Sequence, residues 1–141
     1  MLAVVVGAVG VASGSGVSGA QREEDRKPNI AARVSPPVGF TPLRIRVEVE
    51  LRGGADDYQE YYCPSIEWDW ADGTVSETGD DCAPYQAGKS EIQRRYSATY
   101  TYRTSGEYKV YFRMKQRGKI VGATSANVQV RPGIRGDFDD R

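Results

Sequence analysis

The chain has 141 residues, with 19 basic and 19 acidic side chains, no histidine and two cysteines. This length suits one domain with short flanking segments, and the balanced charge provides no basic excess for a nucleic-acid partner. The missing histidines exclude His-dependent acid–base catalysis, Ser-His triads and the usual zinc ligand sets. Two cysteines are too few for a thiolate metal cluster. The composition therefore predicts that the chain is not an enzyme, with a carboxylate-dependent hydrolase as the less favoured alternative.

Residues 1–20 are predicted to be a secretory signal. Leu2–Ala12 is an apolar run that is too short to span a bilayer, which takes about 20 residues. Ser18-Gly19-Ala20 is a small-residue cleavage site. No basic residue precedes the run, which leaves open a truncated signal, an upstream start or a disordered apolar N-terminus. The signal predicts an extracellular, cell-surface or periplasmic location without a membrane span.

The dense charge run at residues 21–28 is predicted to be a solvated linker, followed by one domain at residues 29–132. Ile30–Val34 is a plausible first strand, ended by the two prolines that follow Ser35. Leu43–Leu51 alternates apolar and charged residues without a break. Period-two alternation indicates a strand with one face in a core and the other in water.

A hairpin is predicted around Asp72-Gly73. Asp-Gly is a strong signal for a two-residue type I′ turn, and Val75–Thr78 would be the return strand. In this register Trp70 lies opposite Val75 and, further out, Cys63 lies opposite Cys82. Residues 58–62 are either a loop or the lead-in to the first strand of the hairpin.

The hairpin register places Cys63 and Cys82 within reach of a disulfide bond. Two cysteines in a small exported domain form a disulfide more often than they stay free, and this bridge would stabilise the fold by about 3 kcal/mol. Strict alternation, however, places Cys63 on the face opposite Trp68 and Trp70. Two reduced thiols are the alternative if the chain is not exported.

The second half of the chain continues the β pattern. Residues 83–91 are predicted to be a loop, and residues 133–141 a polar tail that contains Arg135-Gly136-Asp137, an integrin-type tripeptide that arises easily by chance. About seven short strands without an amphipathic helix are typical of an all-β, two-sheet antiparallel sandwich. The last three of these strands are predicted at Ile92–Tyr102, Tyr108–Met114 and Ile120–Val130.

From Ala31 to Val130 the chain resembles a PKD domain, the immunoglobulin-like sandwich named for polycystic kidney disease. The family hallmark is Trp-Asp-Phe-Gly-Asp-Gly, and residues 68–73 read WDWADG. Residues 39–43 look like the family's entry to its second strand. Trp70 and Ala71 depart from the hallmark, which indicates a divergent member. The positions that match the family's signature are Trp68, Asp69, Trp70, Asp72, Gly73, Tyr102, Gly106 and Tyr108.

These signature residues are expected to serve folding. A tryptophan on the third strand of such a sandwich fills the space between the sheets, and Asp69 and Asp72 are expected to accept backbone N–H groups at the turn. Some PKD domains resemble calcium-stabilised modules. No Asp-x-Asp-x-Asp-Gly loop is present, so solvated loop charge is favoured and no cofactor is expected. The candidate calcium ligands would be Asp56, Asp57, Asp80 and Asp81.

Four tyrosines flank the cysteines and are the candidate binding residues. Clustered exposed tyrosines suit sugar stacking or protein contact, because they offer apolar area and a hydroxyl at low entropic cost. The alternative is that they cover one end of the sandwich. We therefore predict an exported module that binds protein or carbohydrate, or alternatively a surface subunit that self-associates through an edge strand. The candidate residues are Tyr58, Tyr61, Tyr62 and Tyr85.

Overall fold

The computed structural model describes residues 3, 7, 10 and 24–133, and its strands form two packed sheets. Except for residues 3, 7 and 10, the predicted signal lies outside the described residues, as does the Arg135-Gly136-Asp137 tripeptide. The strands are β1 (Asn29–Ser35), β2 (Val38–Phe40), β3 (Leu43–Arg52), β4 (Ser65–Asp69), β5 (Val75–Thr78), β6 (Arg95–Tyr102), β7 (Gly106–Gln116) and β8 (Lys119–Arg131), with a 3-10 turn, η1 (Gln59–Tyr61), before β4.

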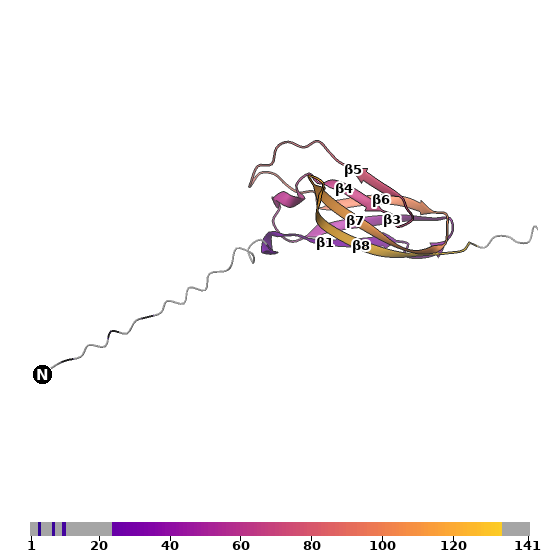
Figure 1. Ribbon diagram of the computed structural model, residues 1–141, viewed down its shortest axis with the longest axis horizontal. Coiled ribbons are helices and arrows are strands. Elements are labelled where there is room, and N and C mark those ends of the chain that lie inside the picture. Colours follow the sequence, from indigo (N-terminus) through magenta and orange to yellow (C-terminus); the bar gives the residue numbers. More distant parts are fainter. Residues whose placement is uncertain (1–2, 4–6, 8–9, 11–23, 134–141) are drawn as a thin grey trace, which may run out of the picture.

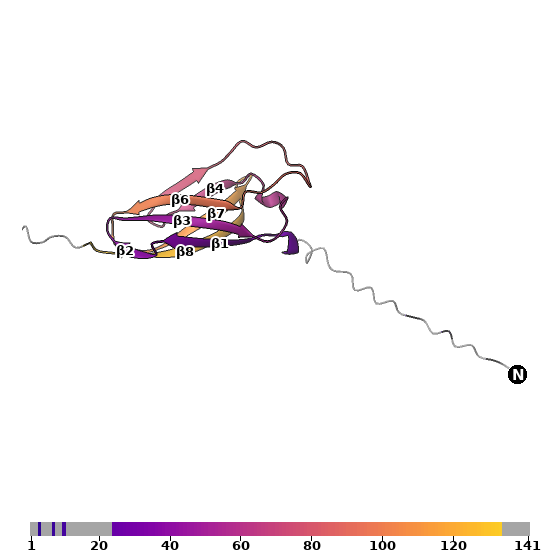
Figure 2. The same cartoon turned by 180° about the vertical axis from the view of Figure 1, so that it is seen from behind.

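One sheet has the order β1-β3-β6 and the other β2-β8-β7-β4-β5. All pairs are antiparallel except β2 with β8, which is parallel. The predicted all-β two-sheet sandwich is therefore confirmed. Figures 1 and 2 show η1 and the long β5–β6 connection at one end of the sandwich and β2 toward the other. The sequence predicts one strand fewer, because β2 has three residues and no alternating pattern.

The core lies between the two sheets and follows from the alternation of their strands. On β3, Ile45, Val47, Val49 and Leu51 point inward and are each 1% exposed. From the other sheet β7 contributes Val110, Phe112 and Met114, and β4 contributes Ile66 and Trp68. Complete burial of such a side chain stabilises a fold by about 1.5–3 kcal/mol, so this double layer of apolar residues holds the sheets together.

The β4–β5 hairpin is shifted by one residue from its predicted register. Val75 pairs with Asp69, not with Trp70, and the Trp70 amide donates a hydrogen bond to the Thr74 carbonyl at 3.1 Å. Ala71 has a φ of 65°, in the left-handed region that non-glycine residues rarely adopt. The predicted two-residue type I′ turn is wrong because Ala71 joins the loop, which has three residues.

The end of the charged run contacts the sandwich. The Ala55 amide donates to the Arg26 carbonyl at 2.8 Å, the Arg26 guanidinium pairs with Asp57 at 3.1 Å, and Pro28 is buried. Gly54 has a φ of 66° and leaves no room for a Cβ, which would lie 2.5 Å from the Arg26 oxygen. Residues 24–28 are therefore held against the loop after β3, and the charged residues 24–27 remain exposed.

Candidate functional site

The two signature tryptophans are buried side by side between the sheets. Trp68 and Trp70 are 5% and 2% exposed, and their rings stack with centroids 5.7 Å apart. Tyr100 of β6 also stacks on Trp70, with centroids 4.5 Å apart. The Tyr102 hydroxyl donates to the Trp70 carbonyl at 2.6 Å, and the Tyr102 ring stacks on Tyr108. This column of rings joins the two sheets, which is a structural role.

The two signature aspartates organise the turn after β4. Asp69 accepts a hydrogen bond from the Ala71 amide at 3.0 Å, and Asp72 accepts one from the Thr74 amide at 2.9 Å. The Tyr100 hydroxyl also donates to Asp72. Although burial alone raises the pKa of Asp72, these hydrogen bonds outweigh burial and hold the pKa below its usual value. Both carboxylates therefore stabilise the turn.

The structure buries Tyr61, one of the four candidate binding tyrosines. Tyr61 is 0% exposed, because the η1 turn points its ring inward against Tyr58, with centroids 4.9 Å apart. Burial raises the pKa of Tyr61 to about 12, and the Glu60 carboxylate adds to the shift. Tyr61 therefore lacks the exposure that its predicted binding role assumed, because local sequence clustering does not reveal which way a 3-10 turn points its side chains.

The other three tyrosines are half-buried, and their hydroxyls hold the end of the sandwich together. Tyr62 donates to the Ala83 carbonyl at 2.6 Å and Tyr85 to the Asp57 carbonyl at 2.5 Å. The Tyr58 hydroxyl donates to Glu60 at 3.0 Å. These contacts tie the β5–β6 connection to the loop after β3, which agrees with the alternative that the tyrosines cover one end of the fold.

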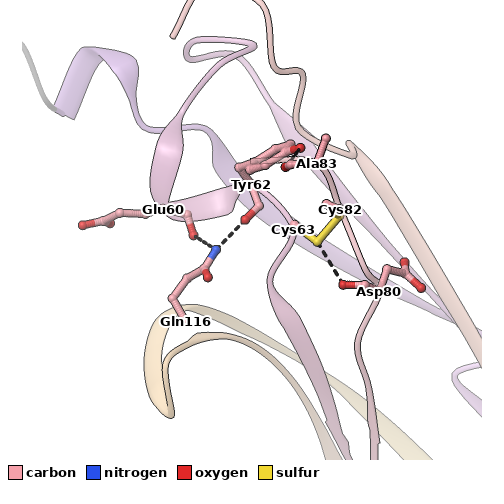
Figure 3. The surroundings of a disulfide bond; sticks show 7 residues. All are labelled: Glu60, Tyr62, Cys63, Asp80, Cys82, Ala83 and Gln116. Atoms are coloured by element: carbon pink, nitrogen blue, oxygen red, sulfur yellow. Dashed lines mark hydrogen bonds between the residues drawn. A yellow bond between two sulfur atoms is a disulfide. The ribbon is translucent and has the colours of Figure 1, made fainter. Parts of the chain in front are cut away.

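The disulfide bond predicted between Cys63 and Cys82 is present, with Cα atoms 6.2 Å apart. Both cysteines lie outside the paired part of the hairpin, so the predicted register does not account for the bond. Cys63 has a φ of 48°, which breaks the strand alternation before β4. Figure 3 shows the bond beside Tyr62, whose carbonyl accepts a hydrogen bond from the Gln116 amide at 2.6 Å. The disulfide thus joins the segment before β4 to the segment after β5, and the Gln116 amide holds the first of these segments.

Two of the four candidate calcium ligands form ion pairs with arginines. Asp56 pairs with Arg94 at 2.6 Å. Asp57 pairs with Arg26 and also accepts a hydrogen bond from the Gly88 amide at 2.9 Å. Within the described residues, no three His, Cys, Asp or Glu side chains are grouped so as to hold a metal ion. The structure therefore does not bring Asp56, Asp57, Asp80 and Asp81 together as one ligand set.

A cleft opens between the edge of β5 and the edge of β6, with a volume of about 470 Å³. Its floor is apolar, formed by Ile66, Trp68 and Pro64, and the Tyr96 ring forms one side. The disulfide and Tyr62 close the cleft at the η1 end. Polar side chains surround the opening: Thr78, Asp80, Glu91, Gln93, Arg95 and Ser97.

The strands on both sides of this cleft have an unpaired edge. β5 ends the five-stranded sheet and β6 ends the three-stranded sheet, and within residues 24–133 no strand pairs with either outer edge. In an antiparallel pair, residues whose N–H and C=O groups face the partner strand alternate with residues whose groups point away from it. The Leu51 amide donates to the Arg94 carbonyl, so the groups of Arg94 face β3. Those of Arg95, Ser97 and Thr99 therefore point away from β3. The Gln93 side chain already donates to the Arg95 carbonyl at 2.7 Å.

This cleft was not predicted, because its chemistry comes from backbone edges and from residues that the sequence places in the core. One signal was present in the sequence: Val75–Thr78 is very short and is followed by residues 79–91 without a strand pattern. A connection of that kind between two sheets leaves one side of the sandwich open. Among the predicted tyrosines, only Tyr62 lines the cleft.

No family model and no characterised protein matches the chain. Solved structures of similar fold include the PKD domain of an M14-like peptidase from a Thermoplasmatales archaeon (12% identity, TM-score 0.48, covering 74% of this chain and 92% of that chain). Another is the CARDB domain of a Pyrococcus furiosus protein in complex with di-metal ions (12%, 0.42, 74% and 90%). A third is a Pseudomonas fluorescens alkylpurine DNA glycosylase bound to DNA (12%, 0.42, 72% and 30%).

The residues that resemble the PKD hallmark can be located in the two-sheet sandwich. In its own structure the residues that resemble the PKD hallmark lie on β4 and in the turn after it, and Tyr102, Gly106 and Tyr108 lie at the junction of β6 and β7. Among the described residues, no helix has the length and apolar character needed to cross a membrane.

Proposed function

We propose that the chain is an exported, non-catalytic recognition module that binds an extended segment of a partner protein in the cleft between β5 and β6. The observation that carries this proposal is the pair of unpaired strand edges on either side of an apolar floor. Such edges bind extended peptides by adding a strand to the sheet. Main-chain hydrogen bonds then provide affinity, and pockets for alternate side chains provide specificity.

The edge of β6 is the side of the cleft best arranged for this mode of binding. A peptide strand paired with β6 would bond to the backbone of Ser97 and Thr99, whose N–H and C=O groups point away from β3. Every second peptide side chain would then face Ile66 and Trp68, which are each 5% exposed. The cleft volume of about 470 Å³ is in the range of ligand pockets.

Three observations support an exported module without catalysis. The bonded cysteines fit an oxidising compartment, because disulfides are rare in reducing ones. The sequence contains no histidine. The carboxylates Glu67 and Asp69, which lie together on β4, are engaged with Arg113 at 3.0 and 3.1 Å and lie on the outer face of the sheet, away from the cleft.

Selection from a phage library of random linear peptides tests this function. Selected peptides should carry apolar residues at alternate positions and change the fluorescence of Trp68 on binding. Ser97→Pro removes an N–H from the free edge while leaving the β3–β6 bonds intact, so it should weaken binding at least 10-fold. Ser97→Ala is the matched control and should bind as the unchanged protein does. Equal binding by both variants, or failure to select any peptide, would refute the proposal.

Self-association through the same edges is a second candidate. All four residues of β5 are exposed, and Val75, an apolar residue, is 52% exposed. A second copy could pair with this edge. Sedimentation equilibrium distinguishes the two: concentration-dependent association that Ser97→Pro or Val75→Lys abolishes would favour a self-associating subunit over a peptide-binding module.

A further inference from the structure

The outer face of the β1-β3-β6 sheet is rich in arginine. Alternation places five arginines and two glutamates, Glu48 and Glu50, on this face, which gives a net charge of +3 in a chain whose own net charge is +0. The strand register sets these side chains in neighbouring rows. We call this surface the arginine face, defined by Arg33, Arg44, Arg46, Arg52 and Arg95.

The arginine face is hollowed at its centre. A depression of about 360 Å³ is lined by four of the five arginines, all except Arg44. The depression exists because two of its positions carry small side chains. Ala31 lies beside Glu50 in one row, and Ser97 lies beside Glu48 in the next. A ligand can therefore sit between the guanidinium groups, close to the backbone of the sheet.

These guanidinium groups are available to a ligand. Arg33, Arg46 and Arg52 pair with Glu48 or Glu50 at 3.0–3.3 Å, but their side chains are 59–79% exposed. Exposed ion pairs of this kind contribute only about 0–1 kcal/mol, so they can be exchanged for ligand contacts at small cost. Arg44 and Arg95 form no ion pair among the described residues.

We propose that the arginine face binds an anionic polysaccharide. Guanidinium groups bind carboxylate and sulfate groups bidentately, and Ser97, Thr99 and Thr101 form a column of hydroxyls on β6 that can bond to sugar hydroxyls. The outward-facing positions of β1, β3 and β6 carry no aromatic anchor of the kind on which protein interfaces depend and on which single-stranded nucleic acids stack. Tyr96 borders the depression, but its ring packs against Phe112 in the core. The depression shares Arg95, Tyr96 and Ser97 with the cleft between β5 and β6, but the peptide would bind through the backbone edge of β6, so this inference does not rest on the peptide site.

Binding to heparin, alginate and neutral dextran, measured by calorimetry at low and high salt, tests the inference. Heparin and alginate separate sulfate from carboxylate recognition. At least one should bind, dextran should not, and binding should fall steeply as salt screens the charges. The variant Arg33→Gln/Arg46→Gln should lose at least 10-fold in affinity. The control Lys89→Gln/Lys119→Gln removes the same charge elsewhere and should bind as the unchanged protein does.

Three outcomes would overturn the inference. The first is that neither heparin nor alginate binds, or that dextran binds equally well. The second is that the control variant loses as much affinity as the Arg33→Gln/Arg46→Gln variant, which would indicate attraction by net charge alone. The third is that poly-glutamate or single-stranded RNA binds while both polysaccharides do not. Arg33 and Arg46 line the depression and not the cleft, so failure at one surface is distinguishable from failure at the other.

Discussion

Two buried tyrosines offer a matched test of how this fold uses polar groups in its core. Tyr102 and Tyr61 are 1% and 0% exposed. The Tyr102 hydroxyl donates to the Trp70 carbonyl at 2.6 Å, whereas the Tyr61 hydroxyl has no hydrogen-bond partner among the described residues. Replacing either by phenylalanine removes one oxygen and leaves the ring in place. The two substitutions should therefore have opposite effects on stability.

Tyr102→Phe should destabilise the protein by about 1–3 kcal/mol, because the buried Trp70 carbonyl is left without this donor. Its ring stacking on Tyr108, with centroids 4.0 Å apart, would remain. Tyr61→Phe removes a hydroxyl whose burial is not compensated, so it should leave stability unchanged or raise it by about 1 kcal/mol. The sign of the difference follows from the presence or absence of one hydrogen bond.

Urea unfolding followed by tryptophan fluorescence measures both effects. With an m-value of about 2 kcal/mol/M, a loss of about 2 kcal/mol lowers the midpoint by about 1 M at unchanged slope. If Tyr61→Phe lowered the midpoint as far as Tyr102→Phe does, the buried Tyr61 hydroxyl would have to make a compensating bond, and the reasoning would fail. A neutral Tyr102→Phe would equally contradict the role given to the bond with Trp70.

Three further predictions concern the disulfide, a charge network and a buried phenol. Cys63→Ala/Cys82→Ala should cost about 3 kcal/mol in urea unfolding, as should reduction of the unchanged protein; an unaltered midpoint would contradict this. A hydrogen bond from Lys115 holds the pKa of Glu67 below its usual value. The stability that this pair contributes is present above the unfolded-state pKa of Glu67 and is lost as pH falls through its lower folded-state pKa. Glu67→Gln should therefore reduce the loss of unfolding free energy with falling pH. Burial, with a contribution from Asp80, raises the pKa of Tyr96 to about 12. In an ultraviolet titration of the tyrosines, Tyr96→Phe should therefore remove one phenol from the phase at high pH and leave the phase near pH 10 unchanged.

Local alternation predicted the strands whose burial is decided by their own residues. β3 reads as alternating apolar and charged residues, and the structure buries every second side chain. β2 could not be predicted in this way, because Val38–Phe40 becomes a strand only by pairing in parallel with the distant β8. The two prolines that precede Val38 also predict the end of a strand at this point. Tertiary pairing, and not local pattern, decides this element.

The predicted hairpin register and the assumed exposure of Tyr61 differ from the structure for conformational reasons. A one-residue change in loop length depends on the left-handed φ of Ala71, which an Asp-Gly pair does not reveal. The inward direction of Tyr61 depends on the η1 turn, and no periodicity predicts the direction of a single 3-10 turn. The Cys63–Cys82 pairing was predicted through a register that the structure lacks, and it is present because both chain segments meet beyond the paired strands.

The two proposed binding surfaces share strand β6, and this constrains what a peptide ligand would look like. The backbone edge of β6 lines the cleft, while the side chains of Arg95 and Ser97 lie on the arginine face. A peptide strand added to β6 would extend the three-stranded sheet, so its side chains would alternate between the apolar floor and the arginine face. Opposite charges on neighbouring strands stabilise pairing. Peptides that bind the cleft should therefore alternate apolar with acidic residues, and an acidic residue beside Arg95 would compete with an anionic polysaccharide for the same guanidinium.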